Sequence, residues 1–106
     1  MKILFDQGTP APLRRELVGH LVETAYERGW STLQNGELIT AAEAEGFEIF
    51  VTTDKNLKYQ QNLKARSLSI VILLSTSWPR IQSSLPAVLT AVNGAVSGGY
   101  VEVPIV

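Results

Sequence analysis

Two acidic residues stand out because each follows a segment that is typical of a buried strand. Asp6 follows the apolar segment 2–5, and Asp54 follows the β-branched and aromatic segment 48–53; the chain has no other aspartate. Ligands of open parallel sheets bind beyond the carboxyl ends of the strands, and neighbouring strands lie about 4.8 Å apart. Two aspartates at adjacent strand ends can therefore share a hard, oxygen-binding cation such as Mg²⁺ or Mn²⁺.

A third carboxylate would make such a metal site more convincing, and Glu37 is the best candidate. It stands near the start of a helix expected from Gly36 to about Glu45, with Asn35 as its N-cap. A side chain in this first turn can point back over the edge of the sheet. The alternative is that Glu37 only interacts with the positive end of the helix dipole.

Polar residues next to both aspartates are candidate substrate ligands. Lysines offer contacts to phosphate, amides offer hydrogen bonds to bases, and a tyrosine offers a stacking face. The alternative for the amide-rich segment 55–63 is a solvated helix, and Arg14 could equally face water. The candidate substrate-binding residues are Gln7, Thr9, Arg14, Asn56, Lys58, Tyr59, Gln60 and Gln61.

The elements expected around these residues alternate between strands and helices. Strands are expected at 2–5, 20–24, 48–53, 69–74 and 100–106, with helices after Pro10, at 36–45 and from about residue 80 to 92, where Pro86 can split the last one. The apolar central strands favour burial on both faces. The pattern predicts an α/β fold, namely a three-layer α/β/α sandwich with a mostly parallel sheet of about five strands.

Size and composition fit one domain covering residues 1–106. The chain has no cysteine, which suits a reducing cytoplasm, and its longest apolar run, at 68–74, is too short for a membrane span. Residues 1–54 hold nine acids against four bases, whereas residues 55–106 hold five bases against one acid. This asymmetry is consistent with a metal site beside a phosphate-binding rim, or with ordinary surface variation.

Three stretches in this order resemble the small bacterial PIN-like domains, which are related to VapC-type toxin nucleases. The stretches are Phe5-Asp6-Gln7-Gly8-Thr9-Pro10, Asn35-Gly36-Glu37-Leu38 and Thr52-Thr53-Asp54-Lys55-Asn56-Leu57. The resemblance covers about residues 1–75. It implies a PIN-like ribonuclease that depends on Mg²⁺ or Mn²⁺, with Asp6, Glu37 and Asp54 as metal ligands and catalytic residues. It further implies RNA as substrate and an antitoxin-like protein as partner.

Two positions depart from the pattern of these relatives. Many relatives carry a glutamate where this chain has Gln7, and a second aspartate where it has Asn56. Each replacement keeps an oxygen ligand but removes a negative charge, which lowers the expected affinity for a dication. The alternative function is therefore a catalytically degraded PIN-like module that binds RNA or a partner protein through residues 55–66.

Other motif matches lack the context that they need. The Asp-x-Gly-Thr pattern at residues 6–9 also occurs in actin-like ATPases, but 106 residues cannot supply their two large domains. A haloacid-dehalogenase phosphatase would need aspartate at position 8, and a response-regulator receiver would need an early acidic pair. The apolar last strand, 100–106, could pair with a second copy as an edge strand, so a homodimer is also an expectation.

Overall fold

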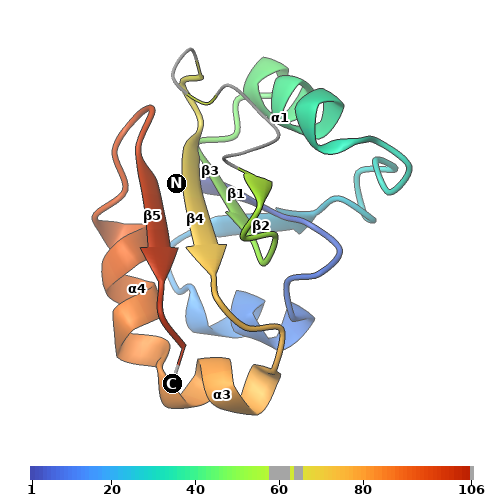
Figure 1. Ribbon diagram of the computed structural model, residues 1–106. Coiled ribbons are helices and arrows are strands. Elements are labelled where there is room, and N and C mark those ends of the chain that lie inside the picture. Colours follow the sequence, from blue (N-terminus) through green and yellow to red (C-terminus); the bar gives the residue numbers. More distant parts are fainter. Residues whose placement is uncertain (58–62, 64–65, 106) are drawn as a thin grey trace.

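The computed structural model describes residues 1–57, 63 and 66–105, and its elements alternate as the sequence indicates (Figure 1). The predicted residues Lys58, Tyr59, Gln60 and Gln61 lie outside the described part. The strands are β1 (Lys2–Phe5), β2 (Leu21–Thr24), β3 (Ile49–Thr52), β4 (Ser69–Leu73) and β5 (Tyr100–Val103). The helices are the 3₁₀ helix η1 (Ala11–Glu16) and the α-helices α1 (Asn35–Ala44), α3 (Trp78–Ser83) and α4 (Leu85–Asn93).

The five strands form one sheet in the order β2-β1-β3-β4-β5, and every pair is parallel. The chain leaves β1 toward β2 on one side of the sheet and returns to β3 on the other side of β1. The boundary between β1 and β3 is therefore the topological switch point, where the connections after neighbouring strands diverge and leave a crevice. The prediction of an α/β fold with a parallel sheet of five strands is confirmed.

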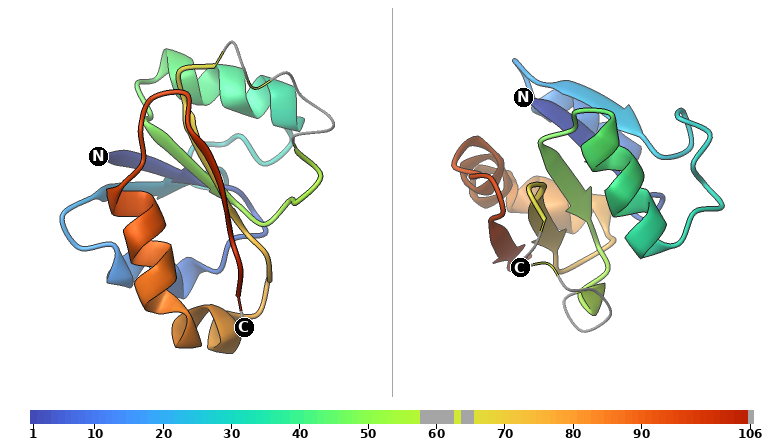
Figure 2. Two further views of the ribbon diagram at one scale, coloured as in Figure 1. Left: turned by 60° about the vertical axis from the view of Figure 1, so that its left-hand side comes forward. Right: turned by 90° about the horizontal axis from the view of Figure 1, so that it is seen from above.

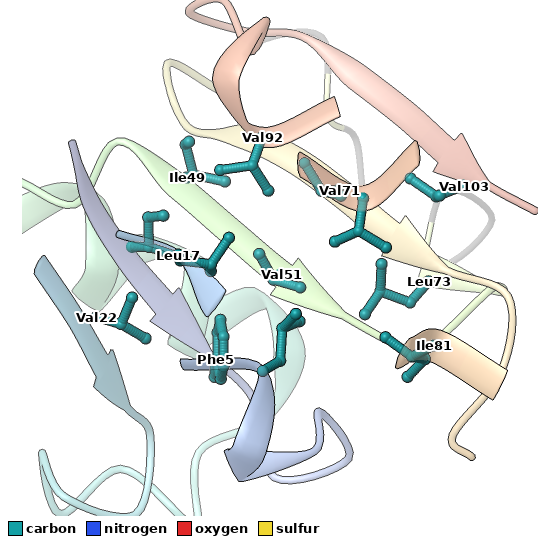
Figure 3. Close-up of a cluster of buried hydrophobic side chains, with 13 residues drawn as sticks. Phe5, Leu17, Val22, Ile49, Val51, Val71, Leu73, Ile81, Val92 and Val103 are labelled. Atoms are coloured by element: carbon teal, nitrogen blue, oxygen red, sulfur yellow. The ribbon is translucent and has the colours of Figure 1, made fainter. Parts of the chain in front are cut away.

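Two layers of helix cover the two faces of the sheet, as the view from above in Figure 2 shows. Side chains alternate along each strand, so the central strands β1, β3 and β4 contribute buried residues to both cores. One core packs beneath η1, α3 and α4 and includes Phe5, Val51 and Ile81 (Figure 3). The other packs beneath α1 and includes Phe50 and Ile39. All residues of β3 and β4 are buried, which is why these strands are apolar on both faces.

The first helical segment differs from the expectation of an ordinary α-helix. Residues 11–16 form a 3₁₀ helix with a proline in its first turn, and only Leu13 among them is buried. Residues 25–29, which follow β2, form turns and no helix. The chain around β2 therefore contributes little helical cover to the sheet.

The second half follows the predicted elements more closely. The expected split of the last helix occurs at Ser84, because Pro86 begins a new first turn, where its missing N–H costs nothing. The last strand is an edge strand, as predicted, but it ends at Val103, just before Pro104. No helix of the described residues is long and apolar enough to cross a membrane.

Helix α1 is attached to the chain that enters β4. The Glu43 carboxylate accepts hydrogen bonds from Arg66 Nη1 (2.9 Å), from the N–H and hydroxyl of Ser67 (2.7 and 3.1 Å) and from the N–H of Leu68 (3.2 Å). Arg66 also donates to Thr40 of the same helix. Burial raises the pKa of Glu43, but the hydrogen bonds outweigh it and leave that pKa below its ordinary value.

Candidate functional site

The two aspartates lie at the carboxyl edge of the sheet, on the strands that flank the switch point. Asp6 directly follows β1, and its N–H donates to the Val51 carbonyl of β3 (3.2 Å), so the β1–β3 ladder continues to this residue. Asp54 lies two residues beyond the end of β3. Parallel sheets bind ligands at this position.

Threonines hold the Asp6 carboxylate from both sides. Its Oδ1 accepts the Thr9 N–H (3.1 Å) and lies 2.7 Å from the Thr9 hydroxyl, while its Oδ2 accepts the Thr52 hydroxyl. The Thr9 hydroxyl is also 2.9 Å from the Val51 carbonyl oxygen and can donate its single proton to either acceptor. Burial raises the pKa of Asp6, and the hydrogen bonds from Thr52 and Thr9 oppose that rise only in part.

Asp54 is held by its own turn and by helix α1. Its Oδ1 accepts the backbone N–H of Asn56 (3.0 Å), and its Oδ2 accepts the Asn35 side-chain amide (2.9 Å). The N–H of Asp54 donates to the Thr52 hydroxyl (3.1 Å), which itself donates to Asp6. Thr52 therefore links the Asp6 side chain to the backbone of Asp54.

The turn after β1 comes close to the turn after β3. A Cβ atom placed on Gly8 would lie 2.6 Å from the Thr53 hydroxyl oxygen, far inside ordinary contact distance. Glycine at this position therefore lets the segment that carries Asp6 approach the segment that carries Asp54.

Glu37 does not join the two aspartates. Its carboxylate accepts the backbone N–H of Gln34 (3.1 Å), and the Gln34 side chain caps the helix in return, so the two form a capping box. The N-cap is Gln34 rather than the expected Asn35, which is the first residue of α1. No group of three or more acidic, histidine or cysteine side chains among the described residues could hold a metal ion.

The predicted substrate residues near Asp6 have different surroundings. Gln7 is exposed beside Asp6, and its side-chain amide lies 3.4 Å from the Ser31 carbonyl oxygen. Thr9 is buried and occupied in holding Asp6. Arg14 instead pairs with Glu27 and donates to the carbonyl of Val22 on β2 (2.8 Å). It is therefore bound at the edge strand β2.

A cavity of about 200 Å³ adjoins Asp6 on the side of α1. Residues 6–8 line it together with Trp30 and Leu33, and Ala25 and Leu38 supply further apolar surface. Asn35, which holds Asp54, also lines it. The sequence predicts only a helix cap for Asn35 and gives no sign that Trp30 lies near Asp6, because both residues are far from Asp6 along the chain.

The fold and the site together define a doubly wound, all-parallel α/β domain with paired aspartates at its switch point. Comparison of the chain with models of protein families, with curated proteins and with solved structures gives no match. The function is therefore argued from the residues of this chain.

Proposed function

We propose that this protein is a PIN-like ribonuclease that depends on Mg²⁺ or Mn²⁺, with Asp6 and Asp54 as ligands of the cation. The observation that supports this most strongly is the link through Thr52, whose hydroxyl donates to Asp6 and accepts from the N–H of Asp54. The Thr52 hydroxyl thereby joins the Asp6 carboxylate to the backbone of Asp54 at adjacent strand ends, before any ligand binds. Such preorganisation avoids a cost of reorganisation when charge develops in a reaction.

The donor set fits a hard dication. A carboxylate has about four acceptor positions. The hydrogen bonds described use two of them on Asp54, whereas Asp6 accepts from two threonines and from the Gly8 backbone, so Asp54 keeps the greater capacity for a cation. No lysine or arginine of the described residues forms an ion pair with either carboxylate. Burial disfavours the ionised form of Asp6, and a cation at the strand ends would offset that penalty.

Two carboxylates suffice for this kind of site, even though Glu37 serves elsewhere as a helix cap. Mg²⁺ commonly keeps several waters and is held by one or two carboxylates together with phosphate oxygens of the substrate. We therefore expect weak binding of metal alone and tighter binding when RNA supplies phosphate.

The chemistry divides between the ion and the chain. A bound divalent ion lowers the pKa of a coordinated water and stabilises negative charge on the phosphate. Thr52 and Thr9 fix the orientation of the Asp6 carboxylate, and Asn35 fixes that of Asp54. Gln7, exposed at the rim, can hydrogen-bond to the substrate.

A second candidate function is a module that binds RNA or a partner protein without cleaving RNA. Two observations favour it, namely the use of Glu37 as a cap and the neutral amides of Gln7 and Asn56, which lower the negative charge of the site. We also propose that the protein acts as a toxin with an antitoxin-like partner. Growth arrest when the wild type is expressed, and no arrest with Asp6→Asn, would support this role.

Calorimetry with Mg²⁺ and Mn²⁺ tests the metal site directly. We expect binding by the wild type that is lost in Asp6→Asn and in Asp54→Asn, with and without a short RNA. Glu37→Gln is the matched control and should keep its metal affinity, because this side chain lies in the capping box. A folded wild type that binds neither ion at millimolar concentration, even with RNA present, would rule out the proposed ligand pair.

Cleavage of a labelled single-stranded RNA then separates the two candidate functions. A nuclease should cleave in Mg²⁺ or Mn²⁺, stop in the presence of a chelator and lose activity in both aspartate variants. RNA binding that persists without cleavage under any of these conditions would support the binding module instead.

A further inference from the structure

The cavity beside Asp6 has the size and wall chemistry of a site for one flat ring. Its volume of about 200 Å³ lies below the roughly 300–1,000 Å³ of pockets that take drug-sized ligands. Its walls include the indole of Trp30 and the apolar side chains of Leu33, Leu38 and Ala25. Polar residues, among them Asp6 and Asn35, also line it.

Trp30 is held in place by its backbone and by its ring. The Trp30 N–H donates to the Ala25 carbonyl (2.8 Å), and the Trp30 carbonyl accepts the Leu33 N–H (3.0 Å). The ring meets Phe47 edge-on, with centroids 6.0 Å apart at 69°, and the Arg28 guanidinium lies 4.8 Å from the indole centroid. A ring anchored in this way loses little conformational freedom when a ligand packs against it.

The rim of the cavity can recognise the edge of a heterocycle. Gln7 is exposed, and its side-chain amide makes one long hydrogen bond, of 3.4 Å, to the Ser31 carbonyl. Side-chain amides pair with the edges of nucleobases through one donor and one acceptor. Asp6, the proposed cation ligand, lines the same cavity, so ring recognition and phosphate binding lie within one nucleotide of each other.

We propose that this cavity is a nucleobase subsite, which binds the base next to the phosphate held at Asp6 and Asp54. The proposal rests on the proposed function for its phosphate site but not for its base contacts. It specifies the substrate as single-stranded nucleic acid, because a base must be free of its duplex partner before it can enter a cavity beside Trp30. Stacking of a base on an aromatic side chain corresponds to a roughly 5- to 150-fold gain in affinity.

Tryptophan fluorescence tests the subsite without relying on cleavage. The chain has two tryptophans, so Trp78→Phe leaves Trp30 as its only tryptophan, which can be excited selectively over the tyrosines. We expect adenosine or uridine 5′-monophosphate with Mg²⁺ to quench this emission, and ribose 5-phosphate to leave it unchanged at equal concentration. Equal quenching by ribose 5-phosphate, or none by either nucleotide, would overturn the proposal.

A second measurement covers the case in which Trp78→Phe does not fold, because Trp78 packs against the core. In wild-type protein, the indole N–H resonance of Trp30, assigned with Trp30→Phe, should shift on addition of nucleotide while that of Trp78 stays fixed. Shifts of equal size at both indoles, or at neither, would contradict a base subsite.

The failure of this proposal can be distinguished from the failure of the metal site. Asp54 lies outside the described residues that line the cavity, so Asp54→Asn should lose metal affinity and keep the Trp30 response to high concentrations of nucleotide. Trp30→Ala should show the opposite pattern, with unchanged Mn²⁺ affinity and a 5- to 150-fold weaker affinity for a short RNA. If Trp30→Ala instead binds RNA as wild type does, or the cavity responds to peptides and not to nucleotides, the base subsite is wrong.

Discussion

Replacement of Glu43 by alanine should destabilise the protein far more than its place on a helix surface indicates. The Glu43 carboxylate accepts from Arg66, from the N–H and hydroxyl of Ser67, and from the N–H of Leu68, and only 19% of its side chain is exposed. Hydrogen bonds to charged groups contribute about 1.5–3 kcal/mol, and a buried N–H left without an acceptor costs about 1–3 kcal/mol. Because Ser67 can turn to water, we expect a total loss of about 2–4 kcal/mol.

Urea denaturation at pH 7 measures this loss. With a slope of about 2 kcal/mol per molar urea, the midpoint for Glu43→Ala should fall by roughly 1–2 M at an unchanged slope. Glu45→Ala is the matched control, because Glu45 lies at the same helix end, is 54% exposed and forms one ion pair with Arg28 (3.0 Å). Its cost should stay below about 1 kcal/mol.

The pH dependence gives a further check on Glu43. Its pKa in the folded state is below the ordinary value, so its contribution to the free energy of unfolding is full at neutral pH and is lost as the pH falls through the folded-state pKa. The difference between wild type and Glu43→Gln should therefore shrink in acid. A Glu43→Ala variant that unfolds within 0.5 kcal/mol of wild type, or no more easily than Glu45→Ala, would refute the reasoning.

Three smaller predictions concern the site and its surroundings. Asp6→Asn should unfold at a higher temperature than wild type at pH 7 in the presence of a chelator. Burial raises the pKa of Asp6 in the folded state, so the wild type loses stability as the pH rises through that pKa, whereas asparagine carries no charge. A lower Tm for the variant would contradict this. Carboxyl NMR should show Glu27 titrating with a pKa of about 2, and Arg14→Ala should return that pKa toward its ordinary value. Gly8→Ala should weaken Mn²⁺ binding in calorimetry, since its Cβ displaces the Thr53 hydroxyl, whereas unchanged affinity would show that the two turns can separate freely.

The sheet could be predicted from sequence because its signal is local. The segments that become β3 and β4 are apolar at nearly every position, and this pattern requires burial on both faces whatever the rest of the chain does. The position of Asp6 and Asp54 followed from the same signal, since each comes soon after the last buried residue of a strand. Strand order then brought them to one edge.

The environment of these aspartates depends on contacts between distant residues, which local patterns do not reveal. Asn35 looks like a helix cap, but its side chain donates to Asp54, and Gln34 takes over the cap with Glu37 as its partner. Trp30 looks like a packing residue because nothing near it in sequence is acidic. The β2–α1 connection brings it to the same cavity as Asp6.

Helix α1 is hydrogen-bonded to the rest of the chain at two points. Its Asn35 side chain donates to Asp54, and its Glu43 carboxylate accepts from the backbone at the start of β4. Both contacts come from a single helix, so α1 fixes the exit from β3 relative to the entrance to β4. For protein engineering, α1 should therefore be kept intact in any redesign of the strand ends beside the two aspartates.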